Sequence, residues 1–222
     1  MDRDPGQPAC PCCVGNEFGE ASARRDLRDY RRSGPHQTTA WLIDALATRG
    51  VERLSVLDIG AGVGAVHLAL LRAGAATAVD VDGSPAFVAV AREEAARQGL
   101  ADQVDYRVGD FVQLVDGVDA ADVVVLDKVI CCYPDMADLV ERSTAHARRR
   151  YGVVYPRDSG WIRAGATVFN GVQRLFRQRL RMYIHRTADV EARIAAAGLR
   201  RTYHRTTTVW QVAVFERAES GA

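Results

Sequence analysis

The stretch VLDIGAGVGAVHLALLRAG at residues 56–74 constrains the fold more than any other part of the chain. It starts as a short apolar strand, runs through glycines at positions 60, 62 and 64, and continues as a helix. Glycine is needed in such a turn because the backbone takes positive φ and a ligand approaches where a Cβ would stand. The amino terminus of the helix then faces that ligand. The pattern predicts a strand, loop and helix unit that binds a cofactor.

Strands and helices alternate along the rest of the chain. Apolar segments predict strands at 54–59, 76–81, 103–108, 121–127 and 151–156. Helical patterns predict helices at 35–48, 63–73, 85–98, 136–149 and 187–199. Two late strands, 200–206 and 208–217, have no helix between them and are expected to pair as a hairpin. We therefore predict an α/β, Rossmann-like, doubly wound and mostly parallel seven-stranded sheet with a C-terminal antiparallel hairpin.

The predicted domain organisation has three parts. Residues 1–34 form an arm, with a cysteine-rich start and a charged helix that is suited to act as a lid. Residues 35–222 form the main domain, and the segment 157–187 is longer than a crossover needs and is interpreted as an inserted cap.

Composition narrows the classes of function. The formal net charge of +1 gives no global attraction for nucleic acid, so we expect no nucleic-acid partner. The start MDRDPGQPACPCC lacks the basic and apolar regions of a signal peptide, and no run reaches the ~20 apolar residues of a membrane span. These features predict a cytoplasmic protein. Its five cysteines are an odd number and are expected to be thiols, metal ligands or core residues.

Two cofactors fit the glycine loop on its own. Gly60, Gly62 and Ala65 also satisfy the looser dinucleotide fingerprint, with Asp80 as the ribose-binding acid, so an NAD-dependent oxidoreductase is one hypothesis. Three further features distinguish the two cofactors. Asp58 lies just before the glycines, VDVDGSPAFVAVARE follows the second strand, and VGDF at 108–111 follows the third.

With these features the sequence closely resembles the class I S-adenosylmethionine-dependent methyltransferases, over roughly residues 35–155. The resemblance implies S-adenosylmethionine as cofactor, with the glycines under its methionine portion, Asp80 on the ribose hydroxyls and Asp110 on the adenine amino group. Val81 and Phe111 would flank the adenine ring. The complete set of candidate cofactor-binding residues is Asp58, Gly60, Gly62, Gly64, Asp80, Val81, Gly109, Asp110, Phe111 and Asp127.

The segment LDKVICCYPD at 126–135 follows the fourth strand and is predicted to be the lip of the active site, because ligands bind beyond the carboxyl ends of parallel strands. Asp127 is interpreted as the partner of the cofactor's ammonium group, and Tyr133 as a residue that orients or deprotonates the acceptor. Cys131 and Cys132 are expected to pack under the pocket. The alternative is a thiol site for zinc or a thiophilic metalloid, which would also use Cys10, Cys12 and Cys13.

The residue composition of the cap indicates the chemistry of the methyl acceptor. It combines an apolar stripe with seven arginines and one acid, which favours a small, anionic and largely apolar molecule. A basic amphipathic helix of this type also suits contact with a membrane surface. The element order resembles, more weakly, the magnesium-protoporphyrin methyltransferase group, whose acceptor carries a carboxylate and needs no base. Candidate catalytic residues are Tyr133, His36 and Asp127, and candidate acceptor contacts are Tyr30, Arg31, Cys131, Cys132, Tyr133, Arg181 and His185.

Overall fold

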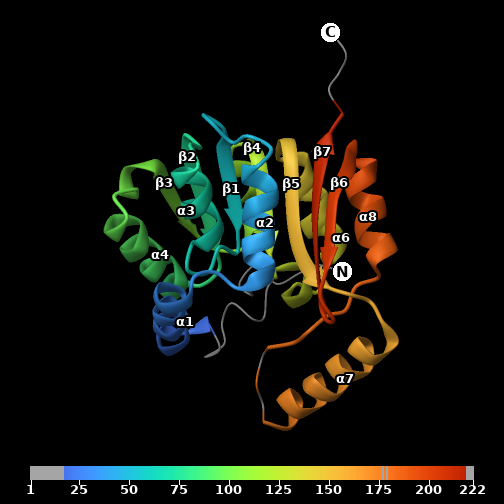
Figure 1. The fold of residues 1–222 in the computed structure, drawn as a ribbon. Coiled ribbons are helices and arrows are strands. Elements are labelled where there is room, and N and C mark those ends of the chain that lie inside the picture. Colours follow the sequence, from blue (N-terminus) through green and yellow to red (C-terminus); the bar gives the residue numbers. More distant parts are fainter. Residues whose placement is uncertain (1–17, 177, 179, 219–222) are drawn as a thin grey trace.

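A seven-stranded mixed sheet forms the centre of the protein (Figure 1). The computed structural model describes residues 18–176, 178 and 180–218. The strands lie in the order β3-β2-β1-β4-β5-β7-β6. Their bounds are β1 (Ser55–Ile59), β2 (Thr77–Asp82), β3 (Val104–Val108), β4 (Ala121–Asp127), β5 (Ala147–Pro156), β6 (Leu199–Thr206) and β7 (Trp210–Arg217).

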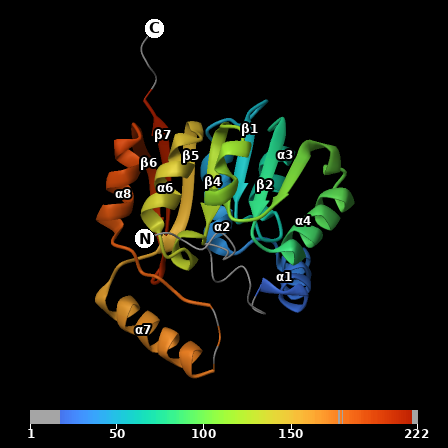
Figure 2. The same ribbon diagram turned by 180° about the vertical axis from the view of Figure 1, so that it is seen from behind.

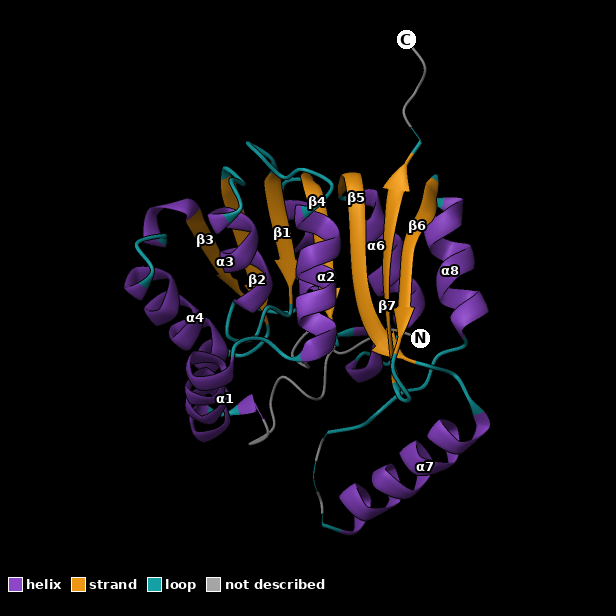
Figure 3. Ribbon diagram, in the orientation of Figure 1, coloured by secondary structure: helices purple, strands orange, loops and turns teal. Residues whose placement is uncertain are grey.

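The first five strands are parallel to one another, and β7 runs antiparallel to both β5 and β6. Figure 3 shows this as an arrowhead on β7 that points away from the edge where the other arrows end. The sheet therefore confirms the predicted fold class, including the C-terminal hairpin. The continuous apolar run of β4 is explained by its central position between β1 and β5, where both faces are covered.

Helices cover both faces of the sheet. On one face lie α2 (Gln37–Ala47), α3 (Ala65–Arg72) and α4 (Pro85–Arg97), and Figure 2 shows the opposite face under α6 (Met136–Ala145) and α8 (Thr187–Ala196). The short helix α5 (Phe111–Leu114) packs beside α6. Short 3-10 turns lie in the connections between strands and helices, among them η3 (Ala101–Gln103), η4 (Val115–Gly117) and η5 (Ile130–Cys132). The predicted start of α4 is correct, since the Ser84 hydroxyl accepts a hydrogen bond from the Phe87 N–H at 3.2 Å.

The predicted boundary between α6 and β5 is wrong. The helix expected over 136–149 ends at Ala145, and β5 starts at Ala147, four residues before the predicted strand. Three successive arginines made residues 148–150 look like the solvated end of a helix. In the structure Arg150 is a strand residue whose guanidinium donates to the carbonyl of Arg49 at 2.6 Å and to Glu216 at 3.2 Å.

Two helices lie beyond the carboxyl ends of the parallel strands, one toward each end of that edge (Figures 1 and 2). These are α1 (Glu20–Ser33) and α7 (Gly160–Leu175), which fall in the predicted arm and cap. Among the described residues, no helix is both long enough and apolar enough to cross a bilayer.

Helix α1 is anchored on α4. Ala23 and Leu27 are buried against Phe87 and Val90. Arg31 donates to Glu94 at 2.8 Å and to Glu93 at 2.9 Å, and the Glu94 side chain has no exposed surface. This ion-pair cluster decides which way α1 faces.

The charge of Glu94 should control the docking of α1. The hydrogen bond from Arg97, followed by those from Arg31 and Gln98, lowers the pKa of Glu94 from 4.5 to about 2. A lowered pKa stabilises the fold above pH 4.5, and this contribution is lost as pH falls toward 2. In Glu94→Gln we expect amide exchange in α1 to accelerate about tenfold at neutral pH, measured by hydrogen exchange and mass spectrometry. Unchanged exchange in residues 20–33 would contradict this anchoring role.

Helix α7 has two different faces. Ile162 and Ala166 are buried, and the side-chain amide of Asn170 makes two 2.8 Å hydrogen bonds with the backbone of Met182. Most large apolar side chains of the helix are exposed, and so is that of Phe176, which directly follows it. Their exposed fractions range from 46% to 78%, and they are Trp161, Val168, Val172, Leu175 and Phe176. The predicted apolar stripe is therefore an outer surface.

Candidate active site

A cavity of about 680 Å³ lies at the carboxyl edge of the parallel strands. The ends of β1, β2, β3 and β4 and the α1 to α2 segment all contribute to its wall. The predicted cofactor residues that line it are Gly60, Gly62, Val81, Gly109, Asp110, Phe111 and Asp127. The fold thus brings together seven of the ten candidates.

The first two glycines of the loop have different tasks. Both have positive φ, 67° at Gly60 and 60° at Gly62. A Cβ on Gly60 would lie 2.6 Å from Cγ2 of Val129, so this position is required for packing against the turn after β4. A Cβ on Gly62 would meet only the Phe87 ring, at 3.9 Å, and the space beside it is open cavity. Gly62 is therefore the position where a ligand can approach the backbone.

Asp58 and Gly64 lie beneath the loop and do not line the cavity. The Asp58 carboxylate accepts hydrogen bonds from the backbone N–H of His67 at 3.2 Å and from its Nδ1 at 2.9 Å. A Cβ on Gly64 would lie 2.8 Å from the same imidazole. These residues hold the start of α3 and so shape the loop from behind.

The structure contradicts the choice of Asp80 as the ribose-binding acid. Asp80 is fully buried, and both of its oxygens lack a hydrogen-bond partner. Burial, with Asp58 and Asp82 nearby, raises its pKa well above the usual value. Asp82, two residues later at the end of β2, lines the cavity. Its carboxylate accepts from the N–H groups of Gly62 at 3.0 Å and Ser84 at 2.8 Å.

Asp110 and Tyr133 form a second polar corner of the cavity. Asp110 caps α5 by accepting from the Val112 N–H at 3.0 Å. The Tyr133 hydroxyl donates to the Asp110 carboxylate at 3.0 Å, and only 4% of Tyr133 is exposed. Tyr133 therefore orients Asp110, and its predicted role of orienting or deprotonating the acceptor stays a prediction.

Asp127 is the polar group at the end of β4. Its Oδ2 accepts from the Thr39 hydroxyl at 2.5 Å, and its Oδ1 lies 3.2 Å from Nζ of Lys128. Sequence reasoning missed Lys128 as a site residue. The available signal was that the only lysine of the chain directly follows a predicted site residue at a strand end.

The two adjacent cysteines belong to the floor of the site. Cys132 lines the cavity, whereas Cys131 is 3% exposed and donates from Sγ to the carbonyl of Lys128 at 3.2 Å. Their sulfur atoms are 3.8 Å apart. Within the described ranges no group of three or more His, Cys, Asp or Glu side chains is arranged to hold a metal ion. The remaining candidate thiols, Cys10, Cys12 and Cys13, lie outside the described residues.

The candidate catalytic residue His36 and the predicted acceptor contact Tyr30 line the cavity. The predicted acceptor contacts Arg31, Arg181 and His185 do not. Arg31 is held on α4 instead. His185 has its Nε2 3.1 Å from the carbonyls of both Ile130 and Tyr133, so it ties the cap segment to η5, and burial lowers its pKa. Arg181 donates to two backbone carbonyls of its own loop.

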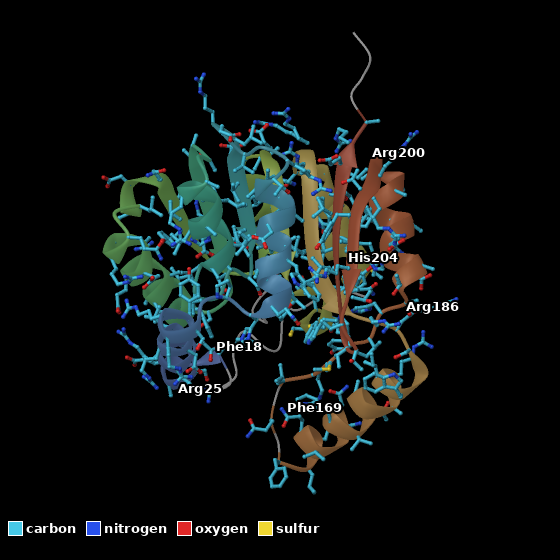
Figure 4. The ribbon with its side chains drawn as sticks, in the orientation of Figure 1. Phe18, Arg25, Phe169, Arg186, Arg200 and His204 are labelled. Carbon is cyan, nitrogen blue, oxygen red and sulfur yellow. The ribbon has the colours of Figure 1, made fainter. Side chains whose placement is uncertain are left out.

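One wall of the cavity is formed by residues of the arm that were not among the predicted site residues. Phe18, Asp29 and Arg32 line the cavity, and the Phe18 ring lies 6.1 Å from that of Phe87. Figure 4 shows Phe18 beside α1 and Phe169 on α7, both beyond the carboxyl edge of the sheet.

Comparison with known proteins identifies the domain. Residues 57–149 match the family model of a methyltransferase domain. This part of the chain is a class I methyltransferase domain. It spans β1 to the start of β5 and includes every strand end that lines the cavity. The predictions of the family and of S-adenosylmethionine as its cofactor are confirmed, and neither NAD nor a thiol-bound metal gains support.

Solved structures share the fold of this methyltransferase domain and of the elements around it. Magnesium protoporphyrin IX methyltransferase from Synechocystis PCC 6803, with bound S-adenosylhomocysteine, has a TM-score of 0.72 at 20% identity and covers 94% of this chain and 99% of its own. Geranyl diphosphate methyltransferase has a TM-score of 0.64 at 15% identity, covering 81% of this chain and 76% of its own.

Curated relatives match a shorter part of the chain. The ribosomal protein L11 methyltransferase of Aeromonas hydrophila is 33% identical over 109 residues, which are 49% of this chain and 36% of that protein. The corresponding protein of Xanthomonas campestris is 47% identical over 77 residues, 32% of this chain and 25% of its own length. The chain thus spans about a third or less of these relatives.

Proposed function

We propose that the protein transfers the methyl group of S-adenosylmethionine to a small, anionic and largely apolar molecule. The observation that carries this proposal is that the glycine loop, Asp82, Asp110 and Asp127 converge on one cavity, beside the wall formed by the arm. Its volume of about 680 Å³ is at the middle of the range for cofactor and ligand sites, and so accommodates the cofactor together with part of an acceptor.

The cofactor is assigned to the ends of the first four strands. Asp82 would accept both ribose hydroxyls, because each carboxylate oxygen that already takes one backbone N–H has a second lone pair. Asp110 would accept from the adenine amino group, between Val81 and Phe111. Gly60 and Gly62 would pass under the methionine portion, and Oδ1 of Asp127, which lies 3.2 Å from Nζ of Lys128, would face its ammonium group.

Transfer of the methyl group requires mainly alignment from the protein. When bound, the cofactor would supply a methyl group activated on a sulfonium, and the bond from sulfur to carbon would break as the acceptor atom bonds to the same carbon. The protein contributes a cavity whose walls fix the approach of the acceptor. His36, at the amino end of α2, lines this cavity and is the residue assigned to contact the acceptor. A carboxylate acceptor needs no base.

Acceptor choice is assigned to the described part of the arm, residues 18–34, together with His36, because no described residue of the cap, 157–187, lines the cavity. The cofactor assignment leaves the side of the cavity formed by Tyr30, Arg32 and His36 for the acceptor. The names of the solved relatives support an apolar body with an anionic group, since geranyl diphosphate and protoporphyrin both have this chemistry. Ribosomal protein L11, named in the curated relatives, is the competing class of acceptor.

Ligand binding tests the proposal first. S-adenosylhomocysteine should raise the melting temperature of the protein, as any ligand selective for the folded state does, and NAD should not. Activity then follows from incubation with methyl-labelled cofactor and pairs of acceptors that differ only in an anionic group, with product mass as the readout. Stabilisation by NAD alone would refute the cofactor part, and labelling of ribosomal protein L11 in place of the small anions would refute the acceptor part.

A further inference from the structure

Lys128 has an unusual backbone for its residue type. It directly follows β4 and has a φ of 64°, in the left-handed region that a residue with a side chain seldom adopts. Its backbone N–H donates to the carbonyl of Val154 at 2.9 Å, which fixes the turn on the neighbouring strand. Such conformations persist where the surrounding structure enforces them, and they concentrate at functional sites. Here the conformation allows a lysine side chain to line the cavity.

The ammonium group of Lys128 is bound to the residues that border the cofactor site. Nζ lies 2.9 Å from Oγ1 of Thr39 and 3.2 Å from Oδ1 of Asp127. The Thr39 hydroxyl in turn donates to Oδ2 of Asp127. In the protein without cofactor, the charge of Asp127 is therefore already balanced by a lysine from the same chain.

The methionine portion of the cofactor brings a competing cation to the same carboxylate. The turn that contains Lys128 lies against the glycine loop, because a Cβ on Gly60 would reach within 2.6 Å of Val129. Two ammonium groups beside one partly buried carboxylate repel each other, and Asp127 is only 16% exposed. Lysine can yield, since its charge stands on a flexible four-carbon stem and its side chain is 27% exposed.

We propose that Lys128 is an exchangeable counter-ion: the amino group of the cofactor takes over Asp127, and the displaced ammonium group of Lys128 then binds the anionic group of the acceptor. The ring of Trp210 has its centroid 6.0 Å from Nζ and gives the cation a favourable contact beside the carboxylate. This inference rests on the proposed anionic acceptor for its second step. It predicts that the cofactor binds first and the acceptor second.

The single lysine makes the first step directly observable. Growth on lysine labelled with carbon-13 at Cε gives one labelled side chain in the whole chain, and therefore one NMR signal. S-adenosylhomocysteine carries the same ammonium group as the cofactor and should shift this signal. Methylthioadenosine, which keeps the adenosine but lacks the amino acid portion, should bind without shifting it. Equal shifts with both ligands would overturn the exchange.

Calorimetry on Lys128→Met gives an independent measurement. Without the competing cation, S-adenosylhomocysteine should bind about tenfold tighter, as expected for removal of one nearby like charge, while methylthioadenosine affinity should not change. Weaker binding of S-adenosylhomocysteine in the variant would mean that Lys128 holds the carboxylate of the cofactor, and would overturn the proposal. Absence of any binding to the unmodified protein would instead refute the proposed function.

The second step is tested with a matched pair of dyes in the presence of saturating S-adenosylhomocysteine. Anilinonaphthalene sulfonate is apolar and anionic, and phenylnaphthylamine is its neutral counterpart. Lys128→Met should weaken the cofactor-dependent binding of the sulfonate about tenfold and leave the neutral dye unchanged, measured by fluorescence titration. An equal loss for both dyes, or no loss for either, would exclude Lys128 as the group that binds the anion.

Discussion

Asp82→Ala should weaken the binding of S-adenosylhomocysteine by about 100-fold or more, because it removes the carboxylate assigned to both ribose hydroxyls and each charge-assisted hydrogen bond contributes about 1.5–3 kcal/mol. The same substitution also frees the N–H groups of Gly62 and Ser84, which the carboxylate now holds at 3.0 and 2.8 Å. Isothermal titration calorimetry measures the affinity. Asp82→Asn retains the size of the side chain and separates the loss of charge from the loss of packing.

Asp80→Asn is the matched control, two residues away on the same strand. Asp80 does not line the cavity, so cofactor affinity should remain within about threefold of the unmodified protein. The raised pKa of Asp80 determines how the stability of the fold changes with pH. The protonated form is favoured in the fold, so stability is present at low pH and is lost as pH rises through the raised value. The asparagine variant should therefore lose this decline in stability with rising pH, which is measured as melting temperature against pH. Loss of cofactor binding in Asp80→Asn would restore Asp80 as the ribose acid.

Valine at Gly60 should prevent stable folding, whereas valine at Gly62 should mainly prevent cofactor binding. Both positions have positive φ, which a β-branched residue resists. Only at Gly60 does the added Cβ also overlap a neighbour, Val129, at 2.6 Å. We expect Gly60→Val to destabilise the protein by about 3 kcal/mol or more, from strain and overpacking together.

Gly62→Val should have a smaller effect on stability and a large effect on binding, because its side chain enters the cavity beside the Phe87 ring. Chemical denaturation measures the first quantity and calorimetry with S-adenosylhomocysteine the second. The comparison fails if Gly62→Val binds the ligand normally, since the cofactor would then not cross the backbone at this loop.

The fold could be predicted because its signals are local. Apolar strands, a capped helix after Ser84 and the glycine loop each determine their own structure from neighbouring residues. The errors arose where distant residues decide the outcome. Arg150 belongs to a strand because of partners on Glu216 and the carbonyl of Arg49, which no local pattern reveals.

The candidate site shows the same division. The glycine loop and the Gly109–Phe111 turn could be selected because their residue types are distinctive. The acid on β2 was predicted two positions too early, at Asp80 in place of Asp82. Asp80 and Asp82 project to the same face of β2, and Asp82 reaches the cavity because it is the last residue of the strand, at the edge where the cavity lies. Arg31 similarly belongs to Glu93 and Glu94 because α1 docks on α4.

The position of β7 has a consequence for how the chain folds. β7 lies between β5 and β6, and it also packs under α2, which is built from residues near the other end of the described chain. Until residues 210–217 have been synthesised, β5 therefore remains an open sheet edge with an unpaired row of backbone groups. Such edges recruit strands from other molecules. During synthesis the incomplete chain should be most prone to aggregation just before β7 emerges. Because β7 pairs with β5 over a long sequence separation, the final step that completes the sheet should be slow.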